Sequence, residues 1–264
     1  MRALNSVSNR DRAEIARSAE EARSFVFTGV DEAQVNRYQS PPPDTPYNLE
    51  YAFHLLGDLR RKTVLDLGCG KGENLVPLSR KGAHVTGIDI SPDLIELARK
   101  RIATSGIEAE ARVGSACDTG LPDESLDAIF CIALIHHLEI PRVRDEMLRI
   151  LKKEGFVILS EPIRFSRVYD RLRTLLPPRG EISEFEHPLT KEQFASMVGP
   201  FTVEGLRYFR LPIVPLVEQA KGATSHSTRR LSAWVIHNFP ATRHFATWAV
   251  ARLRKLPSVS GRRR

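Results

Sequence analysis

The segment TVLDLGCGKGENLVPLSRKGAHVTGIDI, residues 63 to 90, decides the fold class. Its opening run VLDL is apolar enough for a buried parallel strand. A loop with three glycines follows, at Gly68, Gly70 and Gly72. A short helical stretch from Glu73 to Arg80 then leads to a second apolar strand, His84 to Ile88, which ends at Asp89. This order indicates an open parallel sheet, and nucleotides bind beyond the carboxyl ends of such strands.

The glycine spacing distinguishes between two kinds of nucleotide. Dinucleotide-binding loops read G-x-G-x-x-G, and a pyrophosphate sits on the helix that follows. Here the pattern is G-x-G-x-G, and Glu73 occupies the position of the last glycine. A carboxylate at a helix start would repel a pyrophosphate but tolerates a ligand without phosphates. Asp89 lies 21 positions after Gly68, a separation at which an acid accepts hydrogen bonds from two ribose hydroxyls. These features indicate an adenosine with an amino-acid tail.

Three segments together resemble the class I S-adenosylmethionine-dependent methyltransferases: VLDLGCGKG from position 64, GIDIS from position 87, and LPDESLDAIFCIALIHHLE from position 121. The resemblance is greatest to the small-molecule group often described as type 11, and it covers roughly residues 45 to 162. It implies an α/β, Rossmann-like, doubly wound fold with a mostly parallel seven-stranded sheet, an antiparallel last strand and helices on both faces. It also implies S-adenosyl-L-methionine as the cofactor and methyl transfer as the activity.

The resemblance assigns cofactor contacts to the carboxyl edge of this sheet. By it, Asp66 holds the amino group, Asp89 the ribose hydroxyls, and Ile90 packs on the adenine. Ser115 stands where the family usually has an acid near the adenine amine, so this contact departs from the family pattern. The full set of expected cofactor-binding residues is Asp66, Gly68, Cys69, Gly70, Gly72, Asp89, Ile90, Ser115, Ala116 and Cys131.

Methyl transfer requires few catalytic groups, because the sulfonium donor is already activated and correct positioning supplies much of the rate enhancement. A general base helps where the acceptor carries a proton. His136 and Glu161 are the catalytic candidates, since they follow the fourth and fifth expected strands and an imidazole titrates near neutrality. A similar His-His-Leu occurs across the group with many acceptors, which favours a structural role for His136. Glu161 either binds substrate or caps a neighbouring element.

Composition excludes several classes of protein. With 42% hydrophobic and 27% charged residues in a chain of 264, the sequence is typical of a globular protein. No stretch approaches the ~20 continuous apolar residues of a membrane span, and the first residues do not form a secretory signal. The three cysteines lack metal-ligand spacing and indicate free thiols in a reducing cytoplasm. We therefore expect a cytoplasmic protein without a metal site.

The net charge of +7 is concentrated near the C-terminus. From Gln219 to Arg264 the chain has ten Lys and Arg and no Asp or Glu, interleaved with four aromatic residues: Trp234, Phe239, Phe245 and Trp248. This mixture suits an anionic membrane surface or a nucleic-acid backbone. The alternative is a solvated basic surface with both tryptophans in the core. Because no RNA-binding module or base-methylation motif is present, a small-molecule or lipid-like acceptor with peripheral membrane contact is favoured over nucleic acid.

We expect one domain in three parts. Residues 1–47 form a helical lid and a proline-rich linker, residues 48–162 the cofactor core, and residues 163–264 the acceptor cover, the last strands and the basic tail. Residues 245–256 fit an antiparallel strand better than a helix. Two alternative functions stay open: an RNA methyltransferase that uses the basic C-terminal region, and a non-catalytic cofactor-binding or assembly protein of the same fold.

Overall fold

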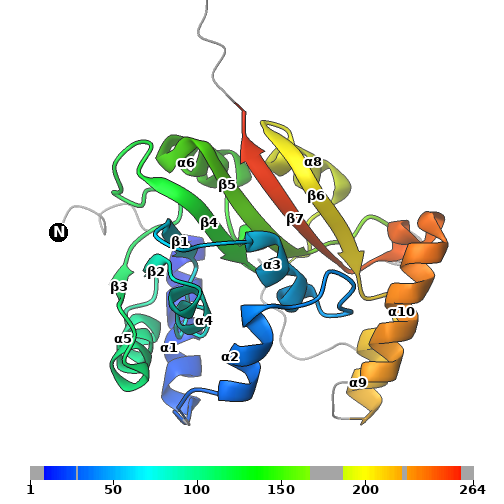
Figure 1. Cartoon of the computed structure of the whole chain (residues 1–264), viewed down its shortest axis with the longest axis horizontal. Coiled ribbons are helices and arrows are strands. Elements are labelled where there is room, and N and C mark those ends of the chain that lie inside the picture. Colours follow the sequence, from blue (N-terminus) through cyan, green and yellow to red (C-terminus); the bar gives the residue numbers. More distant parts are fainter. Residues whose placement is uncertain (1–8, 28, 167–186, 222–224, 257–264) are drawn as a thin grey trace, which may run out of the picture.

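The computed structural model describes residues 9–27, 29–166, 187–221 and 225–256, and these form one twisted sheet between layers of helices (Figure 1). The strands of this sheet run in the order β3-β2-β1-β4-β5-β7-β6. Their bounds are β1 Thr63–Leu67, β2 His84–Asp89, β3 Ala109–Val113, β4 Leu126–Ile132, β5 Leu151–Pro162, β6 Phe201–Phe209 and β7 Trp248–Lys255. The first five strands pair in parallel, and β7 lies antiparallel between β5 and β6. The predicted doubly wound sheet with seven strands and an antiparallel last strand is confirmed.

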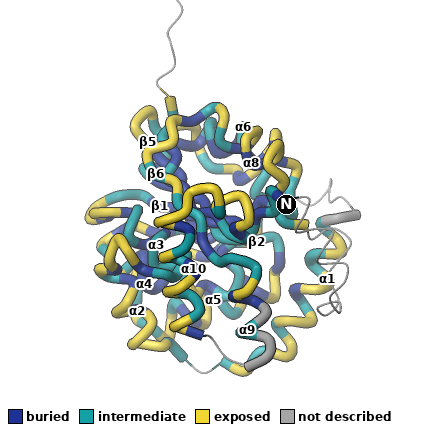
Figure 2. The backbone as a smooth tube through the Cα atoms, turned by 90° about the vertical axis from the view of Figure 1, so that its right-hand side faces the viewer, coloured by how far each residue is buried: buried dark blue, intermediate teal, exposed yellow. Residues whose placement is uncertain are grey.

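Helices cover both faces of the sheet. Their bounds are α1 Asn9–Ser24, α2 Glu32–Gln39, α3 Asn48–Leu56, α4 Leu75–Arg80, α5 Pro92–Ser105, α6 Ile140–Ile150, α8 Lys191–Val198, α9 Ile213–Lys221 and α10 His226–Asn238, with 3-10 turns η1 Ile135–His137 and η2 Pro240–Phe245. The apolar sides of α2 to α5 pack on one face, and those of α6 and α8 pack on the other. Figure 2 shows the resulting pattern, with buried strands inside and exposed outer turns on the helices.

Local sequence explains where the elements lie. Along β1, Val64 contributes to one hydrophobic core whereas Leu65 and Leu67 contribute to the other, as side chains alternate along a strand. Helix α5 begins at Pro92 after the N-cap Ser91, whose side chain accepts a hydrogen bond from the Leu94 amide. Glycine at position 106 ends this helix in the left-handed conformation that a C-cap needs.

Some predicted boundaries differ from the structure. The helix expected from Glu73 starts at Leu75, because the preceding residues complete the glycine turn. The sequence predicts an amphipathic helix from Pro141 to Lys153, but α6 ends at Ile150, since Leu151 already pairs with β4. Helices α2 and α9 were not predicted. The sequence also predicts a basic helix at 164–176 and a polar loop at 181–187, and both lie mostly outside the described residues.

The topology brings distant segments to one edge of the sheet. Because β5 and β6 are both antiparallel to β7, they run parallel to each other. The carboxyl end of β6 therefore lies at the same edge as the carboxyl ends of the five parallel strands. The connection from β6 to β7, which contains α9, α10 and η2, starts from this edge. Figure 1 shows α10 beyond the β6 side of the sheet and α1 near the opposite, β3 side.

Candidate cofactor and active site

A cavity of about 190 Å³ lies where β1 to β4 end, beneath α1. Of the predicted cofactor-binding residues, five line it directly: Gly68, Asp89, Ile90, Ser115 and Ala116. The other five lie outside the described lining: Asp66, Cys69, Gly70, Gly72 and Cys131. Half of the predicted residues therefore meet around one cavity at the carboxyl edge of the sheet, and the other half lie outside its lining.

The glycine loop is shaped by close backbone approaches. Gly68 has φ +75°, and a Cβ there would lie 2.8 Å from the side chain of Leu134. Gly72 also has φ +75°, and its Cβ would lie 3.0 Å from the backbone of Ala98 in α5. The middle glycine, Gly70, donates a hydrogen bond from its amide to the carboxylate of Asp89 at 2.9 Å. The loop is thus tied to the end of β2 and packed tightly on α5.

Asp89 is held by the backbone but keeps acceptor capacity. One carboxylate oxygen accepts the Gly70 amide and the other accepts the Ser91 amide, both at 2.9 Å. A carboxylate has about four lone-pair directions, so each oxygen retains one for a ligand hydroxyl. Burial raises the pKa of Asp89 despite these two hydrogen bonds, and the carboxylates of Glu14 and Glu21 raise it further. A side chain that is fixed and lines the cavity suits ribose recognition.

Asp66 is buried, and among its described neighbours only the side chain of Asn74 acts to lower its pKa. The Asp66 side chain is 1% exposed, and neither carboxylate oxygen has a hydrogen-bond partner among the described residues. Burial, with the nearby charge of Asp89, raises the pKa of Asp66 to about 8. An unsatisfied buried polar group destabilises a fold unless something binds it. The carboxylate therefore fits the ammonium group of an amino-acid tail.

Helix α1 adds acidic side chains above the cavity. Asp11, Glu14 and Glu21 line it, together with one base, Arg17. Lys71 from the glycine loop reaches Glu21 at 2.7 Å and holds the helix in place. An acidic enclosure favours a ligand with positive charge, and S-adenosylmethionine carries a sulfonium and an ammonium against one carboxylate.

His136 and Glu161 form a pair that does not itself line the cavity, although Leu134 and His137 of the same turn do. Glu161, with no exposed surface, accepts the amides of Leu134 and Ile135 at 2.8 Å each on one oxygen. Its other oxygen accepts the Nδ1–H of His136 at 2.8 Å. These contacts correspond to the capping alternative for Glu161. They also orient the imidazole, since a proton on Nδ1 leaves Nε2 as the basic nitrogen. Between β4 and η1, Ala133 adopts φ +54°, a strained conformation typical of functional sites.

The cysteines have no special reactivity in this arrangement. Cys69 and Cys131 are buried, and Cys117 is partly buried. Burial raises the pKa of each thiol, with the Asp66 carboxylate adding to the effect at Cys69 and Cys131. Within the described ranges, no group of three or more His, Cys, Asp and Glu is arranged to hold a metal ion. No described helix has the length and apolarity to cross a membrane.

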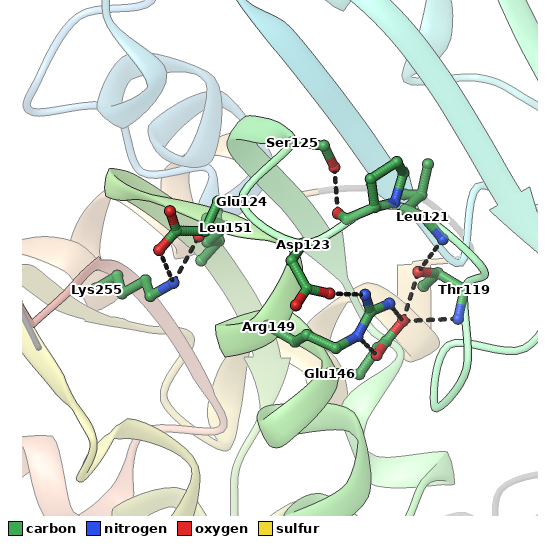
Figure 3. Close-up of polar contacts among 10 residues, drawn as sticks. Thr119, Leu121, Asp123, Glu124, Ser125, Glu146, Arg149, Leu151 and Lys255 are labelled. Carbon is green, nitrogen blue, oxygen red and sulfur yellow. Dashed lines mark hydrogen bonds and ion pairs between the residues drawn. The ribbon is translucent and has the colours of Figure 1, made fainter.

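A polar network fixes the loop that carries Ser115 and Ala116. Glu146 of α6 accepts the amide and the hydroxyl of Thr119, at 2.8 and 2.5 Å, and pairs with Arg149 (Figure 3). Although burial raises its pKa, the hydrogen bonds from Arg149 and Thr119 lower the pKa of Glu146 to about 2. Arg149 also reaches Asp123 further along the same loop. The sequence did not predict this network, because its partners lie 27 residues apart.

The α1 side chains were also missed as site residues. The sequence of α1 predicts only which apolar residues face the core, and it does not indicate which polar residues face a cavity. The acidic excess of the lining, Asp11, Glu14 and Glu21 against Arg17, becomes visible only when α1 is placed over Gly68 and Asp89.

Comparison with known proteins agrees with this geometry. The chain has the fold of class I S-adenosylmethionine-dependent methyltransferases, with their strand order and glycine loop. Residues 65–159 match the family described as a methyltransferase domain. A ubiquinone biosynthesis O-methyltransferase of Xanthomonas oryzae is 35% identical over 117 residues, which cover 44% of this chain and 48% of the relative. The ubiquinone biosynthesis O-methyltransferase of Nitrosomonas europaea is 32% identical over 127 residues, which cover 47% of this chain and 54% of that relative. The chain thus matches about half the length of these relatives.

Solved structures share the fold at low sequence identity. Geranyl diphosphate C-methyltransferase from Streptomyces coelicolor, solved with S-adenosyl-L-homocysteine, has a TM-score of 0.63 at 14% identity; the match covers 95% of this chain and all of that one. A [4+2]-cyclase has a TM-score of 0.56 at 16% identity, with 94% and 93% of the chains covered. Since one fold carries more than one chemistry here, function has to be argued from the site.

Proposed function

We propose that this protein transfers a methyl group from S-adenosyl-L-methionine to an oxygen of a small or amphipathic metabolite. The buried, unpartnered carboxylate of Asp66 carries the proposal, because it lies two residues before Gly68 of the cavity lining and needs a cationic partner. The match of residues 65–159 to the methyltransferase-domain family supports the reaction class. Oxygen as the methylated atom rests on relatives whose names describe an O-methyltransferase of ubiquinone biosynthesis.

Each described group has one role in this proposal. S-adenosylmethionine supplies an electrophilic methyl carbon on a positively charged sulfur. Asp66 binds the ammonium, Asp89 the ribose hydroxyls, and the acidic side of α1 stabilises the positive charge. Gly68 and Gly70 let the backbone approach the ligand. The remaining predicted residues support the site without contacting the ligand: Cys69 and Gly72 in the same loop, and Cys131 in β4. Ile90, Ser115 and Ala116 enclose the adenine end.

His136 is the proposed general base. The acceptor oxygen forms a bond to the methyl carbon while the carbon–sulfur bond breaks and its electron pair stays on sulfur. The hydroxyl proton passes to Nε2 of His136, and Glu161, bound to Nδ1, positions the ring. Glu161 is a positioning residue, since both of its oxygens already accept hydrogen bonds from Leu134, Ile135 and His136.

Helix α1 is proposed to act as a lid. It lies over the cavity and is fixed by contacts that can break without unfolding the core, chiefly Lys71 with Glu21 and His137 with Glu14 at 3.6 Å. A closed lid keeps water from the reacting centre. The described helices between β6 and β7, together with the linker before α3, would then cover the acceptor.

The direct test uses S-adenosylmethionine labelled in its methyl group. The donor is incubated with the protein and with hydroxylated aromatic compounds that carry or lack an isoprenoid chain. We expect label in an organic-extractable product that resists mild base, as a methyl ether does and a methyl ester does not. Asp66→Asn should lose the label, and Asp118→Asn, a change at an exposed acid of the neighbouring loop, should keep it.

Two other outcomes would replace the proposal. If the protein binds S-adenosylhomocysteine but labels nothing in a cell extract, it is a binding or assembly protein, or it catalyses a different reaction as the related cyclase does. If label appears in RNA and in no small molecule, the acceptor is nucleic acid.

A further inference from the structure

We propose that the outer side of α10 and η2 is a docking surface for an anionic lipid membrane. This α10–η2 surface comprises six exposed side chains, four apolar and two basic: Leu231, Trp234, Phe239, Phe245, Arg230 and Arg243. Membrane docking goes beyond methyl transfer, and it can be measured without donor or acceptor.

The exposed positions of α10 recur with helical spacing. Leu231 is 60% exposed and Trp234 is 56% exposed, and they lie three residues apart on one side of the helix. Ser232 and Ile236 are buried on the opposite side, where the hydroxyl of Ser232 accepts the Leu211 amide next to β6. The helix therefore exposes Leu231 and Trp234 to solvent while Ser232 and Ile236 anchor its other side. An ordinary surface helix turns such large apolar side chains inward.

The aromatic side chains extend the same surface past the end of the helix. Phe239 is 54% exposed and meets Trp234 edge to face, with ring centroids 5.9 Å apart. The turn into η2 is fixed by Thr242, whose hydroxyl donates a hydrogen bond to the Phe239 carbonyl at 2.7 Å. Phe245, at the end of η2, is 41% exposed. Rigid aromatic rings on a fixed platform suit the interface between headgroups and acyl chains.

The charge around these rings fits anionic headgroups. From Gln219 to Arg264 the sequence has no acidic residue. The nearest preceding acid in the sequence is Glu218, and its two carboxylate oxygens accept hydrogen bonds from the Arg229 guanidinium at 2.5 and 2.9 Å. Arg230, next to Leu231 in the sequence, and Arg243, two residues before Phe245, are both exposed. Exposed basic and large apolar side chains together are typical of an interfacial helix on anionic lipid.

Lipid is favoured over nucleic acid by the apolar part of the surface. A nucleic-acid backbone is bound mainly by a dense array of Lys and Arg, whereas Leu231 and Phe245 offer nothing to a phosphate. Trp248, which the sequence grouped with these aromatics, is not part of the surface. Its indole donates to the Ser160 hydroxyl at 2.8 Å within the sheet.

The location suits an amphipathic acceptor. Helix α10 follows the carboxyl end of β6, at the edge of the sheet to which the cofactor cavity also belongs. At its first turn, His226 contacts the hydroxyl of Tyr47, and Arg229 lies over the Tyr47 ring, 5.4 Å from its centre. The α10–η2 surface is thus connected to the linker before α3, which approaches the same edge.

Vesicle sedimentation tests the proposal. The full chain is mixed at low salt with vesicles of phosphatidylcholine alone or of phosphatidylcholine with phosphatidylglycerol. We expect binding to the anionic vesicles, weakened at least tenfold by Arg230→Glu with Arg243→Glu, and to a similar degree by Trp234→Ala with Phe239→Ala. All these side chains are exposed, so the variants should keep the melting temperature and the affinity for S-adenosylhomocysteine.

Matched controls and competitors decide the assignment. Val203→Ala with Leu206→Ala removes exposed apolar side chains from β6, and Lys153→Glu reverses an exposed charge at the opposite edge; neither should change binding. Equal binding to neutral and anionic vesicles, no binding, or binding that the α10–η2 variants leave unchanged would overturn the proposal. Tighter binding to RNA, lost in the same variants, would overturn the choice of lipid.

Discussion

Replacing Asp66 by Asn should stabilise the unliganded protein and weaken its binding of the cofactor. With a pKa of about 8 in the fold, against roughly 3.9 in an unfolded chain, the carboxyl binds its proton more tightly when folded. Rising pH therefore lowers stability from about pH 4 upward and has no further effect above about pH 8. The slope is about 1.4 kcal/mol per pH unit, which amounts to an order of 4 kcal/mol at pH 7.

Asparagine removes the charge but leaves a buried amide with few partners, so only part of this energy is recovered. We expect a gain of about 2 kcal/mol at pH 7 to 8, or a rise in Tm of roughly 4–8 °C for a chain of this size. The gain should shrink toward pH 5, where the wild-type carboxyl is protonated. Thermal unfolding at several pH values measures it, with Asp118→Asn as a control at an exposed acid.

Ligand binding should show the opposite effect. If the cofactor's ammonium binds the ionised carboxylate, binding to the wild type at pH 7 releases most of one proton. The affinity for S-adenosylhomocysteine then rises up to tenfold per pH unit and levels off near pH 8. Calorimetry in buffers of different ionisation enthalpy detects the proton, and Asp66→Asn should abolish its release. An Asn variant that is less stable at every pH, or that binds the ligand with unchanged affinity, would refute the reasoning.

The other predictions concern separate parts of the site. Asp89→Ala should weaken S-adenosylhomocysteine binding by about 1.5–3 kcal/mol, typical of hydrogen bonds to a charged group, in a folded protein measured by calorimetry; an unchanged dissociation constant would contradict it. His136→Gln should lower kcat while the KM for the donor stays constant, and an unchanged kcat would show that His136 is not the base. Arg149→Met should cost about 1–3 kcal/mol at pH 7, because Glu146 loses its partner. Since the pKa of Glu146 is lowered to about 2, this contribution is present above about pH 4.5 and is lost as pH falls toward 2, so denaturation curves of variant and wild type should converge in acid.

The sequence predicted the sheet well because each strand is a short apolar run of alternating or fully buried side chains. It predicted the limits of helices less well. Leu151 fits an amphipathic helix by its spacing, yet it pairs with Leu126 in the sheet, a contact that depends on residues 25 positions away. Helix α2 has a local start signal in Asp31, whose side chain accepts the Gln34 amide, but its short length gave no clear apolar period.

The candidate site shows the same limit. The resemblance predicted Gly68 and Asp89 at the carboxyl edge of the sheet, where both line the cavity, because loop glycines and a strand-end acid are local features. It could not reveal that α1 encloses the cavity, since a helix pattern reports its buried stripe and not the polar residues beside it. The two alternatives for Glu161 also stayed open. The hydrogen bonds that its carboxylate accepts come from the amides of Leu134 and Ile135 at the η1 turn, 27 and 26 residues earlier in the chain.

Glu161 and Asp66 show how two buried carboxylates can have different purposes. Asp66 lies near the carboxyl end of β1 and Glu161 near the carboxyl end of β5, with β4 between the two strands. Both side chains are almost completely buried. Glu161 accepts three hydrogen bonds, two from η1 amides and one from His136, so its charge is balanced by the fold itself. Asp66 has no such partner among the described residues, and Asp89 adds a like charge nearby. A fold gains nothing by burying an unpaired acid beside another one. These contacts support the proposal that a cationic ligand pairs with Asp66, whereas Glu161, whose hydrogen bonds are satisfied, is proposed to position His136.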